Sequence, residues 1–344
     1  MRSRTEPRGF SIVIPTFRRR VSLERVLEAL RVQTYPHERL EVVVVNDGGS
    51  DSTSTMVRER RMPFPVRLLE QANLGPAAAR NLGVENATGP FVLFLDDDVV
   101  PVPRLVAEHA AAHGDHDDLV VMGTMLGDGR ERRPWLRWES ETLAQQYAAI
   151  EQGVWEASQW QFYTGNASLM KEHVVRAGGF DVSLRRAEDI ELGVRLQRLG
   201  LRFVFRRAAE GLHLMRRSWH SWLGAARQYG SNDVAFGEIE DRVVEETVYR
   251  HPHTIRLIAW GMRHRSLRAV VPPLARAAAE ATYAVGASRA SMAVCSAVFN
   301  LEYWIGVEQA LGRTEMRNVL RRVEERAQVQ PLFAGRRAGS RLES

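Results

Sequence analysis

Three consecutive aspartates stand at the end of an apolar run. Residues 91–95 read FVLFL and lead directly into Asp96, Asp97 and Asp98. An uninterrupted apolar run is typical of a strand covered on both faces, and ligands of open α/β sheets bind beyond the carboxyl ends of the strands. Adjacent carboxylates repel one another unless a cation neutralises them, and an all-oxygen cluster suits Mg²⁺ or Mn²⁺. The alternative is an exposed acidic turn that leads into a helix.

Two further strand ends carry polar residues. Asp47 follows a second apolar run, in the turn-rich sequence NDGGSDST, and its carboxylate could accept a hydrogen bond from the N–H of a flat base. An Asx turn or a helix cap is the structural alternative. Thr16 and Arg18 follow the first apolar run and would form the wall of the same pocket.

Arg80 lies in the segment NLGPAAARNLG, on a helix expected to begin near Pro76. Its guanidinium stays charged and could pair with Asp47, with Asp96 or with a phosphate. A surface ion pair is the other interpretation.

The elements that position these residues alternate regularly. Apolar runs predict strands, and helical spacing or turn residues predict helices, in this order: strand 10–15, helix 23–32, strand 40–45, a helix capped by Ser50 or Asp51, strand 66–69, helix 77–85 and strand 91–95. This alternation predicts an α/β fold with a parallel, doubly wound sheet.

The composition is that of a globular protein. The chain has 344 residues, 44% of them hydrophobic, and one cysteine, which excludes an intramolecular disulfide. The N-terminus lacks an apolar segment of signal-peptide type, and Arg289 interrupts the longest apolar stretch, so we expect a cytoplasmic protein. The net charge of +5 comes mainly from arginines near both ends of the chain. These arginines belong to solvated tails, or they contact an anionic membrane surface or a phosphorylated substrate. No nucleic-acid motif with stacking aromatic residues accompanies them.

The order and spacing of the motifs resemble glycosyltransferase family 2, the inverting, nucleotide-sugar-dependent enzymes with the GT-A fold. The resemblance covers residues 10–230. It rests on the following segments: IVIPT at 12–16, VNDGGSDST at 45–53, NLGPAAARNLG at 73–83, FVLFLDDD at 91–98, TGN at 164–166, GGFD at 178–181 and EDIELGVRL at 188–196.

This resemblance implies a domain organisation. The expected segments are a flexible basic N-terminus at 1–9, a nucleotide-sugar-binding half at 10–110, an acceptor-binding and catalytic half at 111–235, a helical C-terminal extension at 236–330 and a disordered tail at 331–344.

The resemblance also implies a donor site. Asp47 would contact the base, Asp96 the ribose and Asp98 the metal, whereas Asp97 matches a variable position of the D-x-D motif. His213 is the expected further metal ligand, with His220 as the competing choice. The remaining residues expected around the donor are Pro15, Thr16, Arg18, Asn73, Gly75, Arg80, Gly165 and Asn166.

Inverting transfer needs a base that takes a proton from the acceptor. The resemblance assigns this role to Asp189, at a helix N-terminus whose dipole would keep the carboxylate ionised. Glu188 is the second choice and would contact donor or acceptor hydroxyls. Arg216 and Arg217 would lie in a loop that closes over the diphosphate, or would simply be solvated.

The implied activity is a metal-dependent, inverting and non-processive transfer, because the Gln-x-x-Arg-Trp motif of the processive synthases is missing. UDP is the favoured donor base, with dTDP and GDP open. The acceptor is a glycan, a lipid-linked sugar, a peptide or a natural product. The alternatives are a nucleotidyltransferase, although the basic segment at 15–20 lacks glycines, or a catalytically silent sugar-nucleotide-binding module. A dehydrogenase is disfavoured because no Gly-x-Gly-x-x-Gly follows the first strand.

Two aromatic segments remain. Tryptophans at 135, 138, 155 and 160 are expected between loops, as core or as the wall of the acceptor site. An apolar stripe at helical spacing would pack on the main domain, form a homodimer or attach to a membrane surface at the inner face; it comprises Met292, Cys295, Phe299, Tyr303 and Val307.

Overall fold

The computed structural model describes residues 8–49, 51–127, 129, 131–184, 186–239, 261–262, 264–319 and 321. It divides into two compact units, Met1–Arg217 and Ser218–Ser344. The expected boundary at 235 lies within helix α8, Trp219–Ile239, which packs along α12 in the second unit. The tail at 331–344 and most of the expected N-terminal segment lie outside the described residues.

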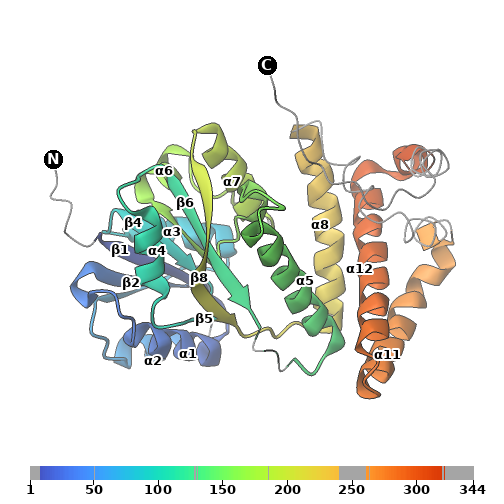
Figure 1. The fold of residues 1–344 in the computed structure, drawn as a ribbon, viewed down its shortest axis with the longest axis horizontal. Coiled ribbons are helices and arrows are strands. Elements are labelled where there is room, and N and C mark those ends of the chain that lie inside the picture. Colours follow the sequence, from blue (N-terminus) through green and yellow to red (C-terminus); the bar gives the residue numbers. More distant parts are fainter. Residues whose placement is uncertain are drawn as a thin grey trace. The chain divides into compact units, whose positions relative to one another are not determined.

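The first unit is built on an eight-stranded sheet with the order β3-β2-β1-β4-β7-β6-β8-β5. Helices lie on both sides of this sheet (Figure 1). The strands are β1 Phe10–Thr16, β2 Leu40–Asn46, β3 Val66–Glu70, β4 Phe91–Leu95, β5 Val99–Pro101, β6 Leu119–Leu126, β7 Asn166–Met170 and β8 Arg202–His213. The helices are α1 Arg20–Arg31, α2 Thr53–Glu59, α3 Pro76–Asn86, α4 Leu105–His113, α5 Pro134–Glu151, α6 Lys171–Arg176 and α7 Glu188–Arg198, with short 3₁₀ turns at His37–Arg39 and Gln159–Gln161.

The sheet is mostly parallel, which confirms the predicted α/β fold. Strand β1 pairs in parallel with both β2 and β4, β2 with β3, and β6 with β8. Strand β7 runs antiparallel between β4 and β6, and the short β5 runs antiparallel to β8. Because β1 and β4 run side by side in the same direction, the residues that follow them meet at one edge of the sheet.

Alternating residues of β1 show why both faces of the sheet are covered. Ile12 and Ile14 belong to the apolar core shared with α1, α2 and α4, whereas Val13 belongs to the core shared with α3, α6 and α7. Gly83 of α3 has no side chain because a Cβ there would lie 2.3 Å from Cγ1 of Val13. This helix therefore packs closely on the strands that carry the site.

The start of α2 differs from the prediction. The helix begins at Thr53 after Ser52, whose side chain makes no capping hydrogen bond. Ser50 lies outside the described residues. Asp51 instead accepts hydrogen bonds from the Thr53 hydroxyl (2.5 Å) and from the Arg20 backbone N–H (3.1 Å), so it ties the loop before α2 to the start of α1.

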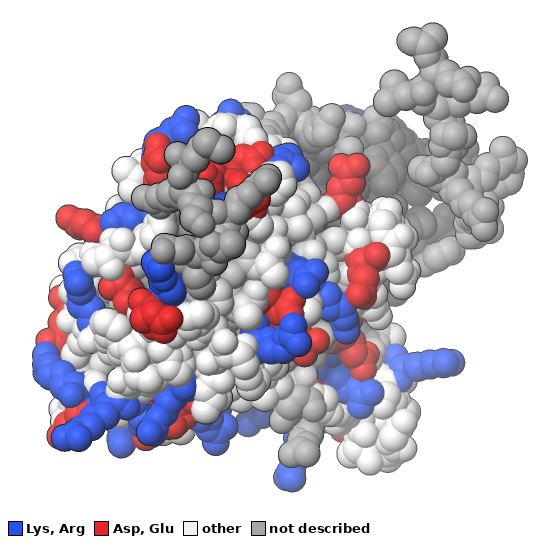
Figure 2. Space-filling model, turned by 60° about the vertical axis from the view of Figure 1, so that its left-hand side comes forward, with Lys and Arg blue, Asp and Glu red and all other residues white. Residues whose placement is uncertain are grey.

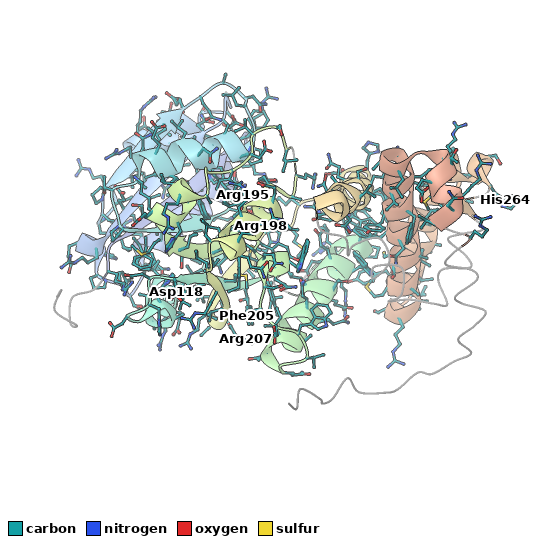
Figure 3. The ribbon with its side chains drawn as sticks, turned by 90° about the horizontal axis from the view of Figure 1, so that it is seen from above. Asp118, Arg195, Arg198, Phe205, Arg207 and His264 are labelled. Carbon is teal, nitrogen blue, oxygen red and sulfur yellow. The ribbon has the colours of Figure 1, made fainter. Side chains whose placement is uncertain are left out.

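The tryptophans were expected between loops, but residues 134–151 form the helix α5, which was not predicted. Trp135 is fully buried and donates a hydrogen bond from Nε1 to the Arg217 carbonyl at 2.9 Å. The buried residues of α5 gather at its two ends, so the apolar spacing between them is too sparse to indicate a helix. Near its C-terminal end, Tyr147 stacks on Phe205 of β8 with the ring centroids 5.1 Å apart (Figure 3 labels Phe205).

A buried polar network joins α4 to the sheet. His109 lies between Ser168 (2.8 Å) and Asn166 (2.9 Å), and His113 lies 2.8 Å from the same Ser168 hydroxyl. Burial lowers the pKa of His109 to about 4 and that of His113 to about 3. Both imidazoles are therefore neutral at pH 7 and act as hydrogen-bonding parts of the core.

The second unit is helical in its described part, with α8, a 3₁₀ turn at Arg265–Ala269, α11 Val271–Ala284 and α12 Ser288–Leu311. Helices α8 and α12 touch along their backbones. A Cβ at Gly230 would lie 2.0 Å from the Tyr303 carbonyl oxygen, and one at Gly306 would lie 1.9 Å from the Arg227 carbonyl oxygen. Only glycine allows this approach.

Helix α12 contains the predicted apolar stripe. Cys295 and Val307 are buried in the second unit, so part of the stripe forms its core. Among the described residues, α12 is the helix whose length and composition would suffice to cross a membrane, and 50% of its most apolar window is buried. Core helices of water-soluble proteins meet the same condition, so no membrane assignment follows.

Acidic and basic side chains are interleaved over the described part of the face that Figure 2 shows. Many of the chain's arginines have acidic partners, as in the ion pairs of Arg8 with Asp117 (2.7 Å) and of Arg58 with Glu70 (2.7 Å). A pocket with several arginines on one side is therefore a local feature that needs its own explanation.

Candidate functional site

The three aspartates leave β4 at the edge where β1 also ends, and two arginines bind them. We call Arg19, Asp97 and Asp98 the Arg19 cluster. Arg80, Asp96, Glu188 and Asp189 form the Arg80 cluster. The triplet therefore connects both clusters, since Asp96 belongs to one and its two neighbours belong to the other.

In the Arg19 cluster a single guanidinium spans two carboxylates. Nη1 of Arg19 lies 3.2 Å from Oδ1 of Asp97 and also contacts Oδ2 of Asp98. Thr16, the last residue of β1, donates a hydrogen bond to Oδ2 of Asp97 at 2.7 Å. Burial raises the pKa of Asp97 to about 7, while the charge of Arg19 opposes the shift. The residue predicted as the variable member of the motif is thus tightly held in the structure.

His213, at the end of β8, faces Asp98. Its Nε2 lies 3.6 Å from Oδ1 of Asp98, and the backbone of β8 continues alongside through a 2.7 Å hydrogen bond from Leu214 N to the Asp98 carbonyl. A metal ion with bonds of about 2.1 Å can reach both atoms at once. A carboxylate with an imidazole suits Mn²⁺ at least as well as Mg²⁺.

These two residues fit a divalent cation only as a partial set of ligands. The described residues contain no group of three or more His, Cys, Asp or Glu side chains placed to hold a metal. Any ion held by Asp98 and His213 would need oxygen ligands from a bound molecule or from water. His220, the competing choice, lies on α8 in the second unit.

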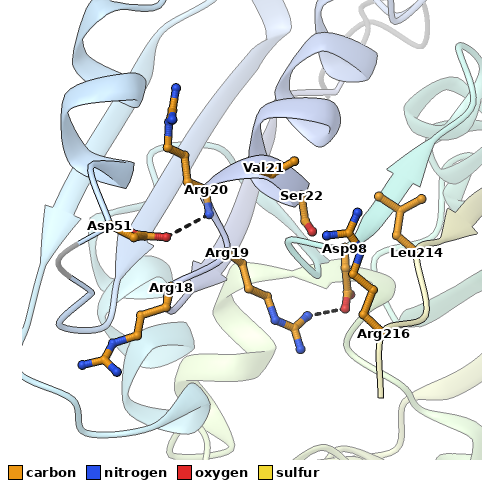
Figure 4. Close-up of a pocket in the computed structure, with 9 residues that line it drawn as sticks. All are labelled: Arg18, Arg19, Arg20, Val21, Ser22, Asp51, Asp98, Leu214 and Arg216. Carbon is orange, nitrogen blue, oxygen red and sulfur yellow. Dashed lines mark hydrogen bonds and ion pairs between the residues drawn. The ribbon is translucent and has the colours of Figure 1, made fainter. Parts of the chain in front are cut away.

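A pocket of about 420 Å³ opens beside the Arg19 cluster (Figure 4). Its lining carries four arginines and two aspartates; the residues are Arg18, Arg19, Arg20, Val21, Ser22, Asp51, Asp98, Leu214 and Arg216. Arg18 adopts a left-handed backbone (φ 52°), a strained conformation for a residue with a side chain, and its guanidinium carbon lies 5.0 Å from the centre of the Phe17 ring. Several guanidinium groups around one pocket are typical of sites that bind phosphate.

The two arginines after β8 differ in their surroundings. Arg216 lines the pocket, as expected for a residue that could contact a diphosphate. Arg217 does not, because its side chain pairs with Glu139 of α5 at 2.7 Å and its carbonyl accepts the bond from Trp135. Only Arg216 is in place for the role predicted for both.

In the Arg80 cluster the guanidinium is buried. Nη1 of Arg80 donates to Oε1 of Glu188 at 2.8 Å, and Nη2 donates to Oδ1 of Asp96 at 2.9 Å. The ring of Phe180 lies beneath it, 5.7 Å from the guanidinium carbon. Of the open choices for Arg80, the structure therefore selects Asp96 and adds Glu188, a residue 108 positions away in the chain.

Asp189 lies in the first turn of α7, next to Glu188. Burial raises its pKa to about 7, the charge of Glu188 raises it further and Arg80 opposes the shift. We expected the helix dipole to keep this carboxylate ionised, but loss of solvent has the larger effect here. The residue before the helix, Ala187, is left-handed (φ 60°), so the backbone is strained where the acidic pair begins.

Asp47 organises a loop. Its Oδ1 accepts hydrogen bonds from Gln71 Nε2 (2.7 Å) and Leu74 N (2.8 Å), and its Oδ2 accepts one from Gly75 N (2.9 Å). Gly75 has a φ of 94° and precedes α3, while Asn73 is exposed in the same loop. A carboxylate has about four lone-pair positions, so Asp47 keeps about one for a ligand.

Gly165 and Asn166 differ in their position relative to the site. The Gly165 carbonyl accepts the Asp96 N–H at 3.1 Å, and a Cβ at Gly165 would lie 2.9 Å from Oδ2 of Asp96 and 2.4 Å from Sδ of Met125. The Asn166 side chain points into the core, where its amide donates to the carbonyls of Thr124 (3.0 Å) and Ala209 (2.8 Å). The structure brings Gly165 to the site, but not the side chain of Asn166.

Arg19 was not among the site residues predicted from the sequence, whereas Arg18 and Thr16 were. Pro15, also named there, is a half-buried member of β1 opposite Val45. The segment at 18–20 consists of three arginines, so residue type could not distinguish among them. The turn between β1 and α1 decides which one reaches the aspartates.

Both the fold and the sequence of this chain are similar to those of known proteins. The fold is that of GT-A glycosyltransferases. The structure is similar to mannosyltransferase PcManGT from Pyrobaculum calidifontis, which was solved with GDP-Man and Mn²⁺. The TM-score is 0.62, the sequence identity is 21%, and 87% of each chain is covered. It is also similar to residues 1–349 of S. aureus TarS, solved with UDP, with a TM-score of 0.52, 17% identity and 89% and 92% of the two chains covered. The Glycosyl transferase family 2 model matches residues 11–180, so this part of the chain belongs to the family.

Among curated proteins, the chain is similar to validoxylamine A glucosyltransferase of Streptomyces hygroscopicus subsp. jinggangensis. The two are 30% identical over 285 residues, which cover 75% of this chain and 64% of the relative. The corresponding protein of subsp. limoneus is also 30% identical, and the match covers 60% of it. The chain thus spans about three fifths of the length of these relatives.

Proposed function

We propose that the protein is a metal-dependent, inverting glycosyltransferase that moves one or a few sugars from a nucleotide-diphosphate sugar to an acceptor nucleophile. The observation that carries this proposal is the bridge made by Arg80. It joins Asp96, at the end of β4, to Glu188, and so brings Asp189 to the edge of the sheet where the basic pocket opens. A candidate base and a candidate diphosphate site then lie on either side of the aspartate triplet.

The donor would bind along this edge. The arginines of the pocket would contact the diphosphate, Asp98 and His213 would hold Mn²⁺ or Mg²⁺, and Asp96 would face the ribose. A bound metal would neutralise the charge that develops on the leaving diphosphate. The loop held by Asp47 would contact the base, with UDP favoured and dTDP or GDP open.

The acceptor would lose its proton to Asp189. A base is most effective when its pKa lies near the working pH, and the pKa of Asp189 is raised to about 7. Glu188, held by Arg80, would contact hydroxyl groups of the donor or acceptor. The acceptor class (glycan, lipid-linked sugar, peptide or natural product) would be selected outside the two clusters.

A thermal-shift screen of UDP-, dTDP- and GDP-sugars, each with and without Mn²⁺, tests the donor site. We expect one nucleotide to raise the melting temperature only when Mn²⁺ is present. Asp98→Asn should abolish the metal-dependent part of the shift. If no nucleotide stabilises the protein in a metal-dependent way, the proposed donor site is wrong.

Cytoplasmic localisation, a peripheral membrane contact and a homodimer through the C-terminal helices are further proposals. The basic termini support the membrane contact, and the half-buried members of the stripe on α12 (Met292, Phe299 and Tyr303) support the homodimer. Sedimentation of the purified protein and flotation with anionic vesicles test the last two. A monomer that stays at the bottom of the gradient would contradict both.

A further inference from the structure

The guanidinium of Arg19 lies where a cation is expected. It contacts Asp98, the proposed metal ligand, and Asp97 beside it, so both carboxylates already have a positive partner. A divalent ion held by Asp98 would carry the same kind of charge to the same place. Like charges that close repel, so the ion and the guanidinium are alternative partners of Asp98.

The backbone of Arg19 is anchored, but its side chain is not enclosed. The Arg19 carbonyl accepts hydrogen bonds from Ser22 N and Leu23 N, both at 3.0 Å, which fixes it at the start of α1. The side chain is 51% exposed and crosses from this anchor to the aspartates. A long, solvent-exposed side chain on an anchored backbone can change its binding partner without any movement of the fold.

The pocket offers the second position. Arg19 lines it together with three other arginines, and Figure 4 shows the side chain reaching across to Asp98. A diphosphate in this pocket would attract the guanidinium, which forms paired hydrogen bonds with phosphate as well as with carboxylate. The geometry therefore gives Arg19 one partner before a donor binds and another afterwards.

We propose that Arg19 is an exchangeable counter-ion that couples metal binding to diphosphate binding. Without a donor it neutralises Asp97 and Asp98 and weakens the binding of a free divalent ion. A donor diphosphate takes over the guanidinium and releases Asp98 to the metal, so metal and donor bind with positive coupling. This proposal rests on the proposed donor site and adds the order in which the site is filled.

Binding coupling is reciprocal, which gives the proposal two measurable sides. In Arg19→Gln, Mn²⁺ should bind about tenfold more tightly in the absence of nucleotide, since allosteric coupling of this kind is usually worth 5–150-fold. The nucleoside diphosphate that stabilises the wild-type protein should bind more weakly to the variant at saturating Mn²⁺. The factor by which the nucleotide enhances Mn²⁺ affinity should therefore shrink.

The experiment is a Mn²⁺ titration followed by electron paramagnetic resonance, without nucleotide and with UDP or GDP, on wild type and variants. Arg20→Gln is the matched control, because it removes the same charge from the same pocket, whereas the hydrogen bond from Arg20 to Asp51 comes from its backbone. Arg19→Lys keeps the charge and should lie between wild type and Arg19→Gln. Melting curves of each variant verify that the fold is intact.

The outcomes separate the two proposals. Loss of Mn²⁺ binding in Asp98→Asn shows that the wild type binds the ion through Asp98. If Arg19→Gln and Arg20→Gln then bind Mn²⁺ equally well without nucleotide, the exchange is wrong but the donor site is retained. If Asp98→Asn leaves Mn²⁺ binding unchanged with every nucleotide, the donor site itself is wrong. If Arg19→Gln binds Mn²⁺ more tightly than the wild type in the absence of nucleotide, and Arg20→Gln does not, the result supports the exchange.

Discussion

Arg19 and Arg80 each bridge two carboxylates at the same edge of the sheet, but they do so in different surroundings. The Arg19 side chain is 51% exposed, on the turn between β1 and α1. The Arg80 side chain is 7% exposed, within α3. The same chemical pairing thus occurs once with a guanidinium that is open to solvent and once with a buried guanidinium.

Solvent decides what each bridge contributes. An exposed ion pair contributes about 0–1 kcal/mol because water competes for both charges. Breaking a buried pair by removing one partner costs about 3–5 kcal/mol, because it leaves a charge without compensation. We therefore assign a permanent positioning role to Arg80 and an exchangeable one to Arg19. The predictions below test this contrast.

The largest effect should come from the buried side. Asp189→Asn should lower turnover by about 10²–10⁴-fold, the usual contribution of a general base, and leave donor binding intact. Single-turnover kinetics together with calorimetric donor titration separate the two quantities. Full turnover in the variant would show that Asp189 is not the general base, and Glu188→Gln would then be the next variant to test.

The second effect concerns stability. Arg80→Gln should lower the free energy of unfolding by about 3–5 kcal/mol, because it leaves Asp96 and Glu188 near each other without their shared cation. Urea unfolding followed by circular dichroism measures this difference. Arg80→Lys, which keeps the charge but can no longer donate to both acids from one planar group, should lose less. A loss below 1 kcal/mol in Arg80→Gln would remove the distinction between the two arginines.

The third effect is the pH dependence of turnover. The pKa of Asp189 is raised to about 7, and a base works only when deprotonated, so kcat should fall about tenfold per pH unit below that value and level off above it. Because the charge of Arg80 opposes the rise in pKa, the midpoint should move to higher pH in any Arg80→Gln protein that folds. A midpoint near pH 4 would show that Asp189 is more solvated than the structure indicates.

The smallest effect should come from the exposed side. Arg19→Gln should change the free energy of unfolding by about 1 kcal/mol or less, because the Arg19 side chain is 51% exposed and water competes with it at the two carboxylates. The same urea experiment measures it beside Arg80→Gln. A loss as large as that of Arg80→Gln would make Arg19 a structural residue and would argue against its exchange.

Much of the fold could be predicted from the sequence. The apolar runs at 10–15, 40–45 and 91–95 are strands, and the sheet they form is mostly parallel, because fully buried strands have a continuous apolar pattern. Helix α5 was missed because its buried residues lie at its ends. Periodicity reports one face of a helix, and here much of that face is only partly buried.

The site was less predictable, for a physical reason. The family resemblance already implied metal binding at Asp98 and His213 and proton transfer at Asp189. Their environments come from residues far away in the chain: Arg80 reaches Glu188 across 108 positions, and Arg19 reaches Asp98 across 79. Burial of Asp189 and the choice of Arg19 over Arg18 arise only when the chain is folded.

One feature of the second unit has a practical consequence. Cys295 is the only cysteine in the sequence, it is buried on α12, and burial raises the pKa of its thiol to about 12. Thiolate is the reactive form, so a maleimide dye at neutral pH should label this residue only when the helices separate. The chain thus contains a natural fluorescent-labelling reporter for opening of the helical unit. Donor binding reports on the first unit, so the folding of the two units can be followed separately in one sample.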